Sequence, residues 1–195
     1  MTKTIYLDNE TLDDIDMSDD MKVIGCYHDY YDRPSGQEHY RLLKYFAKNI
    51  DGHIIEIGTH CGTSAVALAT ATEHDVITYD IVDVKENDLS NIKNLTFRLC
   101  EFTGDDDYKE KILNSKMIFI DAPHTGEFEQ MCYDWLVENN YKGITIWDDI
   151  HLNEEMEIFW YGVEQNKMDV SDYGHSTGTG IIFFSDDIEI GLLWK

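Results

Sequence analysis

Three aspartates stand where two apolar stretches of the sequence end. Asp121 follows one stretch, and Asp148 and Asp149 follow the next. Carboxylate oxygens that converge on one point are the ligands that Mg²⁺ prefers, and without a cation they would repel one another. If the two stretches are neighbouring strands, the three aspartates predict a site for a divalent cation, with Mg²⁺ as the expected ion.

A histidine lies close to the first of these aspartates. His124 follows Asp121 by three residues. An imidazole group titrates near neutrality and can accept a proton from a hydroxyl group. The sequence therefore predicts a catalytic pair, with His124 as the base and Asp121 beside it. The alternative is a loop histidine that only orders its neighbours.

A glycine-containing turn follows an earlier apolar stretch, in the segment Glu56-Ile57-Gly58-Thr59-His60-Cys61-Gly62. Gly58 allows a sharp turn, and Gly62 allows a ligand to approach the backbone closely. The G-x-x-x-G spacing differs from that of dinucleotide sites, and an acid before Gly58 would attract an ammonium group. Asp80, about twenty residues on, can accept both hydroxyls of a ribose. These features predict a site for an adenosine that carries a cationic amino acid. The alternative is a turn that serves only chain geometry, with Asp80 as a helix cap.

Alternating strands and helices must position these residues. The predicted strands are residues 53–57, 75–79, 95–100, 116–120, 143–147, 180–184 and 188–193. The predicted helices are residues 35–48, 64–72, 105–113, 127–139 and 154–165. This alternation predicts an α/β fold with a single Rossmann-like, doubly wound, mainly parallel seven-stranded sheet, in which ligands bind outside the carboxyl ends of the strands. The last two strands predict an antiparallel hairpin at one edge.

The chain is expected to divide into an acidic N-terminal lead-in, residues 1–34, and one domain, residues 35–195. Residues 8–20 are rich in acids, which predicts a solvated, partly flexible segment. Ser35 can cap the first helix of the domain, and Glu38 can complete a capping box. Several side chains around this point could cover a ligand, although ordinary helix packing is favoured. They are Tyr30, Tyr31, Arg33, Gln37, Glu38 and His39.

The composition restricts the expected partners and location. A net charge of −24, with only 15 dispersed Lys and Arg residues, argues against nucleic acid. No apolar run reaches membrane-spanning length, and the first residues lack the pattern of a secretory signal. Four scattered cysteines suit the reduced thiols of a cytoplasmic protein. An aromatic content of 12% is compatible with a homodimer.

The segment from Ile54 to Ser64 resembles motif I of the class I methyltransferases that use S-adenosylmethionine (SAM). Asp80 matches their ribose-binding acid, and the resemblance covers roughly residues 35–184. In that family the loop after the third strand touches the adenine, which would here be Glu101, Phe102 and Thr103. The expected cofactor-binding residues are Glu56, Gly58, Thr59, Gly62, Ser64, Asp80, Glu101, Phe102 and Asp121.

The aspartates resemble those of metal-dependent O-methyltransferases of the catechol and macrolide-sugar types. Asp121, Asp148 and Asp149 stand at the metal-binding positions of those families, and His124 stands at the position of the base. A histidine there, together with an Asp-Asp pair, is more similar to the sugar-acting type. The resemblance implies methyl transfer to a hydroxyl of a sugar or glycan, on an acceptor oriented by the metal. The chain is short for this type, so the size of the acceptor is left open.

Three other functions compete with this one. A metal-independent small-molecule methyltransferase would leave the aspartates structural, and a non-catalytic SAM-binding domain would have no use for His124. A nicotinamide oxidoreductase would need the missing G-x-G-x-x-G motif. His151, Asn153 and His175 could contact the metal or the acceptor, but Asn153 could equally cap a helix and His175 could lie in a simple turn.

Overall fold

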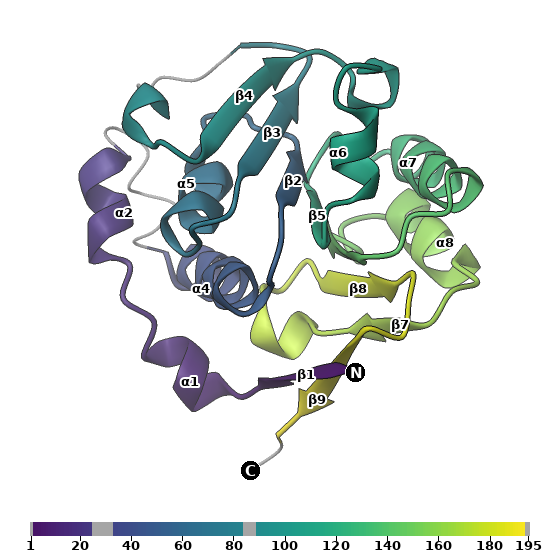
Figure 1. The fold of residues 1–195 in the computed structure, drawn as a ribbon. Helices are drawn as coiled ribbons and strands as arrows, with labels where there is room; N and C mark the ends of the chain where they lie inside the picture. Colours follow the sequence, from purple (N-terminus) through teal and green to yellow (C-terminus); the bar gives the residue numbers. More distant parts are fainter. Residues whose placement is uncertain (1, 25–32, 84–88, 194–195) are drawn as a thin grey trace.

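A seven-stranded sheet with helices on both faces forms the centre of the molecule (Figure 1). The computed structural model describes residues 2–24, 33–83 and 89–193. The strands are β1 (Lys3–Leu7), β2 (Ile54–Ile57), β3 (Val76–Asp80), β4 (Leu95–Leu99), β5 (Met117–Ile120), β6 (Ile144–Asp148), β7 (Lys167–Asp169), β8 (Thr179–Phe183) and β9 (Ile188–Leu192). The helices are α1 (Asn9–Asp13), α2 (Ser18–Val23), α4 (Pro34–Asn49), α5 (Thr63–Thr70), α6 (Lys109–Leu113), α7 (Glu127–Glu138) and α8 (Glu154–Gly162). Short 3₁₀ turns lie at η1 (Leu89–Asn91), η2 (Phe102–Gly104) and η3 (Ser171–Tyr173).

The sheet has the order β4-β3-β2-β5-β6-β8-β7. Strands β4, β3, β2, β5 and β6 pair in parallel, whereas β8 is antiparallel to both β6 and β7. From β2 the chain continues to β3 and β4 on one side of the sheet and then returns to β5 and β6 on the other side. The strand order therefore reverses between β2 and β5. A ligand crevice is expected at this point, outside the carboxyl ends of the strands. The predicted α/β class and a mainly parallel seven-stranded sheet with an antiparallel edge pair are confirmed, although one of the seven strands is not a predicted one.

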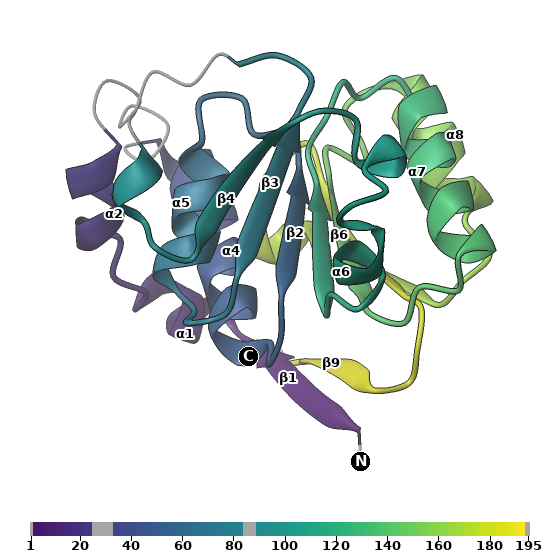
Figure 2. The same ribbon diagram turned by 45° about the horizontal axis from the view of Figure 1, so that its top comes forward.

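Alternate residues of each central strand enter two different hydrophobic cores. In β2, Ile54 packs into the core under α4 and α5, and Ile55 packs into the core under α6, α7 and α8. The two views agree that these helix groups cover opposite faces of the sheet (Figures 1 and 2). Both faces of the central strands are therefore buried, as a parallel sheet requires.

The predicted hairpin at the C-terminal edge is wrong in its second strand. Strand β9 pairs in parallel with β1, from Lys3 opposite Ile188 to Leu7 opposite Leu192, in a separate two-stranded sheet. The short strand β7, which the sequence did not indicate, pairs with β8 instead. Each strand has only two hydrogen-bonding edges, and those of β8 are taken by β6 and β7.

The N-terminal segment packs on the domain where the structure describes it, although most of its acidic side chains are exposed, as predicted for a solvated segment. Leu7 and Leu12 belong to the core under α4. The carboxylate of Asp20 is fully buried and accepts hydrogen bonds from Lys44 Nζ at 2.7 and 2.8 Å. Thr70 on α5 also donates to Asp20, at 2.6 Å. Several acids of the segment are solvent-exposed, but the segment as a whole packs on the domain. The division at residue 34 stays a prediction.

Two helix starts also differ from the prediction. Helix α4 begins at Pro34, with Arg33 as an N-cap that makes no side-chain hydrogen bond, so Ser35 is not its cap. Proline suits this place because the first helical N–H group has no partner within the helix. Helix α6 begins only at Lys109, because Asp105 forms a bidentate ion pair with Arg98 on β4. Tyr30 and Tyr31 lie outside the described residues. None of the described helices has the length and apolar character needed to span a membrane.

Candidate functional site

The turn from β2 into α5 needs both of its glycines. Gly58 has a φ of +102°, and a Cβ atom there would lie 1.8 Å from the carbonyl oxygen of Asp121. Gly62 has a φ of +89° and forms the N-cap of α5. The N–H groups of Gly58 and Thr59 both donate to the carbonyl of Tyr79, at 2.9 and 3.1 Å. These two hydrogen bonds hold the turn against the end of β3. The lack of a side chain at Gly58 leaves the backbone there open to a ligand.

Glu56 lies directly before this turn and is fully buried. Its Oε2 atom accepts a hydrogen bond from the hydroxyl of Thr78, whereas Oε1 has no hydrogen-bond partner among the described residues. Burial raises the pKa of Glu56 to about 8, although the nearby hydroxyls of Ser64 and Thr78 oppose that rise. A buried carboxylate with an unused oxygen is suited to receive a positively charged group.

Asp80 ends the neighbouring strand β3. Its two oxygens accept hydrogen bonds from the N–H groups of His60, at 2.8 Å, and Val82, at 3.0 Å. These bonds hold the carboxylate between two turns at the edge of the sheet. Each carboxylate oxygen has a second lone pair, so Asp80 can still accept hydrogen bonds from a ligand.

A cavity of about 420 Å³ lies beside Asp80, and we call it the Phe102 pocket. Its volume falls within the range usual for small-molecule sites. Phe102 is buried, with its ring 5.2 Å from that of Trp135 in an edge-to-face contact. The residues lining the pocket are Ile57, Gly58, His60, Tyr79, Asp80, Ile81, Cys100, Glu101, Phe102, Thr103, Asp121, Ala122, Pro123, Phe128 and Met131.

A second cavity, of about 350 Å³, lies on the other side of Gly58, and we call it the acid–histidine pocket. It is lined by Arg33, Gly36, His39, Tyr40, Gly58, Thr59, His60, Cys61, Thr63, Ser64, Asp121, Asp148, Asp149, His175 and Thr177. The two pockets share Gly58, His60 and Asp121. A ligand in one pocket can therefore meet a ligand in the other at the end of β2 and β5.

His124 lies between two of the predicted metal ligands. Its Nε2 atom is 3.3 Å from Oδ1 of Asp121 and 3.6 Å from Oδ2 of Asp149. Burial alone would lower the pKa of His124, but the hydrogen bond to Asp121 and the charges of Asp149 and Asp148 raise it to about 9. Burial and the charge of Asp148 raise the pKa of Asp121. The structure thus places His124 beside Asp121 and Asp149. His124 itself lines neither pocket, and the three aspartates do not form a group whose ligand atoms all lie within 4.8 Å of one another among the described residues.

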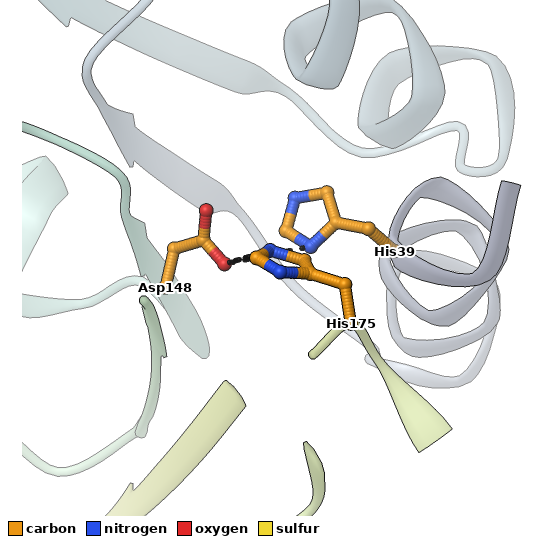
Figure 3. A group of neighbouring side chains, drawn as sticks. All are labelled: His39, Asp148 and His175. Carbon is orange, nitrogen blue, oxygen red and sulfur yellow. Dashed lines mark hydrogen bonds and ion pairs between the residues drawn. The ribbon is translucent and has the colours of Figure 1, made fainter. Parts of the chain in front are cut away.

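Asp148 turns toward two histidines that lie far from it in the sequence (Figure 3). His175 Nε2 is 2.7 Å from Asp148 Oδ1, and His39 Nδ1 is 3.6 Å from the same oxygen. Among the described residues, these three offer ligand atoms that all lie within 4.8 Å of one another. The sequence favoured plain packing for His39 and left His175 open. Their positions on α4 and before β8 give no local spacing that could have paired them.

The loop that carries His124 is held from two helices. Glu129 on α7 accepts hydrogen bonds from the N–H groups of His124, at 3.1 Å, and Gly126, at 2.7 Å. Asn153 accepts from the N–H of Met156 as the N-cap of α8, and its amide donates to the carbonyl of His124 at 3.0 Å. The cap alternative for Asn153 is therefore confirmed, and its second hydrogen bond positions the loop.

Most of the remaining candidate residues from the sequence line neither of the two pockets. His151 pairs with Asp169 on β7, with 2.7 Å between Nε2 and Oδ2, and neither pocket is lined by it. Gln37 and Glu38 line neither pocket, whereas Arg33 lines the acid–histidine pocket.

Unsatisfied polar atoms gather at the site. Seven buried side-chain atoms of the described residues lack a hydrogen-bond partner. Four of them belong to site residues, namely His39 Nδ1, Glu56 Oε1, His124 Nδ1 and Asp149 Oδ1. A buried unpaired polar group costs about 1–3 kcal/mol, so this concentration of unpaired atoms indicates that the site is built to bind polar ligands.

No protein-family model and no curated protein matches this sequence. Solved structures do match its fold. The SAH-bound methyltransferase PaMTH1 of Podospora anserina has a TM-score of 0.58 at 13% identity, over 94% of this chain and 99% of its own. SAH is S-adenosylhomocysteine, the product that SAM leaves after methyl transfer.

Two O-methyltransferases have TM-scores slightly below that of PaMTH1. TomG of Streptomyces achromogenes, involved in tomaymycin synthesis and solved with SAM, has a TM-score of 0.54 at 15% identity, over 92% of this chain and 91% of its own. An O-methyltransferase of Bacillus cereus in complex with SAH has a TM-score of 0.51 at 18% identity, over 91% and 92%. The chain therefore shares its fold with these SAM- and SAH-bound methyltransferases.

Proposed function

We propose that this protein is a SAM-dependent O-methyltransferase that methylates a hydroxyl of a sugar or glycan. The observation that carries the proposal is the meeting of two pockets at Gly58 and Asp121, each lined by polar groups suited to one reactant. The similarity of fold to SAM- and SAH-bound methyltransferases supports it.

The Phe102 pocket fits the methyl donor. Asp80 lines this pocket and can accept the two ribose hydroxyls. Glu56 lines neither pocket, and its Oε1, which has no hydrogen-bond partner among the described residues, is the proposed acceptor for the ammonium of the methionine part. Glu101, Phe102 and Thr103 line the far part of the pocket, where an adenine would fit. Gly58 has no side chain to obstruct a ligand at the border between the two pockets. The roles of Thr59, Gly62 and Ser64 are to shape this turn, with Thr59 and Ser64 facing the acceptor side.

The acid–histidine pocket fits a polar acceptor. Asp121, Asp148 and Asp149 all line it, and Oδ1 of Asp149 has no hydrogen bond, so their oxygens are the proposed ligands of a divalent cation such as Mg²⁺. Among the described residues only His39, Asp148 and His175 form a group of three whose ligand atoms all lie within 4.8 Å of one another, so the three aspartates would have to move closer to share an ion. When bound, such a cation would orient hydroxyl oxygens, lower their pKa and offset the acidic charges that keep His124 protonated.

His124 is the proposed base of the transfer. Its unprotonated imidazole accepts the proton of the acceptor hydroxyl as the oxygen forms a bond to the methyl carbon. The bond between carbon and sulfur breaks, and its electron pair remains on sulfur, which leaves SAH. Gly58 and Asp121 border both pockets, so the fold supplies the alignment that such a displacement needs.

The lining of the acceptor pocket favours a sugar over a catechol. Histidine, aspartate, serine and threonine side chains dominate among its described residues, and no aliphatic Val, Leu, Ile or Met side chain lines it. A flat aromatic acceptor would be expected to bury its ring against apolar groups, whereas a sugar presents hydroxyls to such polar groups.

Transfer of a labelled methyl group from SAM to a panel of acceptors tests the proposal. We expect product with glycosides that carry neighbouring hydroxyls, less with catechol, and inhibition by EDTA. The variant His124→Ala should bind SAH normally and lose at least 100-fold in turnover. Transfer that is insensitive to EDTA would favour a metal-independent enzyme. SAH binding without transfer to any acceptor would favour a non-catalytic SAM-binding domain.

A further inference from the structure

We propose that His39, Asp148 and His175 form a cation site that takes a transition metal such as Co²⁺, Zn²⁺ or Mn²⁺ in preference to Mg²⁺. The site lies in the acid–histidine pocket, and its three residues come from α4, the end of β6 and the loop before β8 (Figure 3). Its role in catalysis rests on the proposed methyl transfer, but its existence rests only on the geometry of these side chains.

The ligand atoms have spacings that a single ion can bridge. His175 Nε2 and His39 Nδ1 lie 2.7 and 3.6 Å from Asp148 Oδ1, and the three atoms lie within 4.8 Å of one another. Ligands about 2.1 Å from one ion stand roughly 3.0–3.4 Å apart, a spacing between the two measured distances. The ligand atoms lie as far as 4.8 Å apart, so the two imidazole rings would have to move closer by about 1 Å for all three atoms to bind one ion.

His39 has no other evident use for its Nδ1 atom. The side chain is only 5% exposed, lines the pocket, and leaves Nδ1 buried without a hydrogen-bond partner. A metal ion would satisfy this atom, whereas nothing among the described residues does.

His175 is oriented by its second nitrogen. Its Nδ1 atom lies 2.6 Å from the hydroxyl oxygen of Thr177. Without an ion, Nε2–H donates to Asp148 Oδ1 at 2.7 Å. With an ion bound, the ring proton would lie on Nδ1 and donate to Thr177, which would leave the lone pair of Nε2 free for the ion. Such support from behind a ligating histidine is a common feature of metal sites, because it fixes the tautomer and the ring.

Asp148 is the acid that lies within 4 Å of both histidines, whereas Asp149 approaches only His175, with 3.8 Å between Oδ1 and Nδ1. Asp121 and Asp149 both lie close to His124 Nε2, which already offsets part of their charge. Asp148 instead directs Oδ1 at the two imidazoles of His39 and His175. Two nitrogen ligands suit Co²⁺, Zn²⁺ and Mn²⁺, whereas Mg²⁺ prefers oxygen ligands and water.

Titration of the metal-free protein with Co²⁺, followed by its visible absorption, tests the proposal directly. We expect one Co²⁺ per chain, bound at least 100-fold more tightly than Mg²⁺ measured by competition. The variants His39→Asn and His175→Asn should each lose at least tenfold in Co²⁺ affinity. The control His74→Asn changes a partly exposed histidine that lines neither pocket, and should stay within about threefold of the wild type.

Thermal unfolding and SAH affinity show whether each variant is folded. His175→Asn changes a loop residue, so it remains informative if His39→Asn unfolds. Loss of Co²⁺ binding in Asp121→Asn with retention in both histidine variants would overturn the proposal, as would the absence of Co²⁺ binding to the wild type. Co²⁺ binding that depends on the histidines, in a protein that binds no SAH, would support the metal site and contradict the proposed methyl transfer.

Discussion

Glu56, the proposed partner of the SAM ammonium, is a residue whose charged form would destabilise the fold. A carboxyl group with no exposure to water and one unpaired oxygen destabilises the fold whenever it is charged. Its ordinary pKa of 4.5 is raised by burial to about 8. The folded protein therefore holds this proton more tightly than the unfolded chain does. The stability that this proton provides is complete below pH 4.5 and is lost as the pH rises through 8.

The variant Glu56→Gln should remove this pH dependence. Glutamine keeps the shape of the side chain without the charge, so the variant should be more stable than the wild type above pH 8, by on the order of 1–3 kcal/mol. The difference should vanish near pH 4.5. Urea unfolding at a series of pH values measures it, with the exposed Glu110→Gln as the control.

The same variant should bind SAH about tenfold more weakly, because glutamate can release its proton beside the ammonium and become its charged partner, whereas glutamine cannot. A stability difference that is independent of pH would contradict the raised pKa of Glu56. Unchanged SAH affinity would contradict its role in the binding of the amino-acid part.

Site residues differ in how far the sequence could predict them. Glu56 and Asp80 stand beside strand ends and a glycine turn, so local spacing was enough to single them out. His39 and Asp148 are separated by more than a hundred residues, and only the packing of α4 against the sheet brings them together. A histidine in an amphipathic helix has the same local pattern whether it packs or binds a ligand, so sequence alone favoured packing.

At the scale of elements, the turn between β2 and α5 is the part that tolerates least change. The variant Gly58→Ala would place a Cβ atom 1.8 Å from the carbonyl oxygen of Asp121, at a φ of +102° that side chains rarely adopt. We expect a loss of at least 3 kcal/mol in the free energy of unfolding. Gly162→Ala, on α8, is the matched control because no atom lies within 4 Å of the added Cβ.

The control should leave stability unchanged or raise it by up to about 1 kcal/mol, since alanine favours the helix. Denaturant unfolding measures both variants. Equal effects of the two substitutions would show that the turn is not as tightly enclosed as the structure indicates.

Helix α8 and the loop of His124 are joined through Asn153, and two variants separate its two hydrogen bonds. Asn153→Ala removes both the cap and the bond to the carbonyl of His124, and should cost about 1 kcal/mol, or roughly 2–4 °C in Tm. Asn153→Asp keeps the cap and loses only the donor, so its Tm should stay close to that of the wild type.

Turnover should respond differently from stability in these variants. Both lose the bond that positions the loop, so both should reduce kcat with labelled SAM, while SAH affinity stays constant. A decrease of kcat in Asn153→Ala alone would mean that the cap, and not the bond to His124, supports the site.

The elements show why part of the fold could be predicted and part could not. Strands such as β2 and β5 are buried on both faces. Their sequences are therefore short, mainly apolar runs followed by a glycine or an acid, which local patterns can identify. Strand β7 has three residues, two of them charged, and carries no such signal. The partner of β9 lies at the opposite end of the chain, so its pairing depends on a contact that local patterns do not encode.

At the scale of the whole molecule, the charge of −24 should weaken the fold by self-repulsion. Salt screens exposed charges over a Debye length of about 10 Å at 0.1 M. We therefore expect Tm to rise by several degrees as NaCl increases from about 0.02 to 0.5 M. Scanning calorimetry measures this, with KCl as the control for a specific ion effect. A constant or falling Tm would contradict a net repulsive surface.

Calorimetric titration with SAH tests the central claim, the proposed use of SAM, most directly. We predict micromolar binding at one site per chain, weakened about tenfold or more in Asp80→Asn, because the amide loses the charge that accepts the ribose hydroxyls. The exposed Asp107→Asn serves as the control and should bind as the wild type does. No heat of binding in the folded wild type, or equal affinity in Asp80→Asn, would contradict the assignment of the Phe102 pocket to the methyl donor.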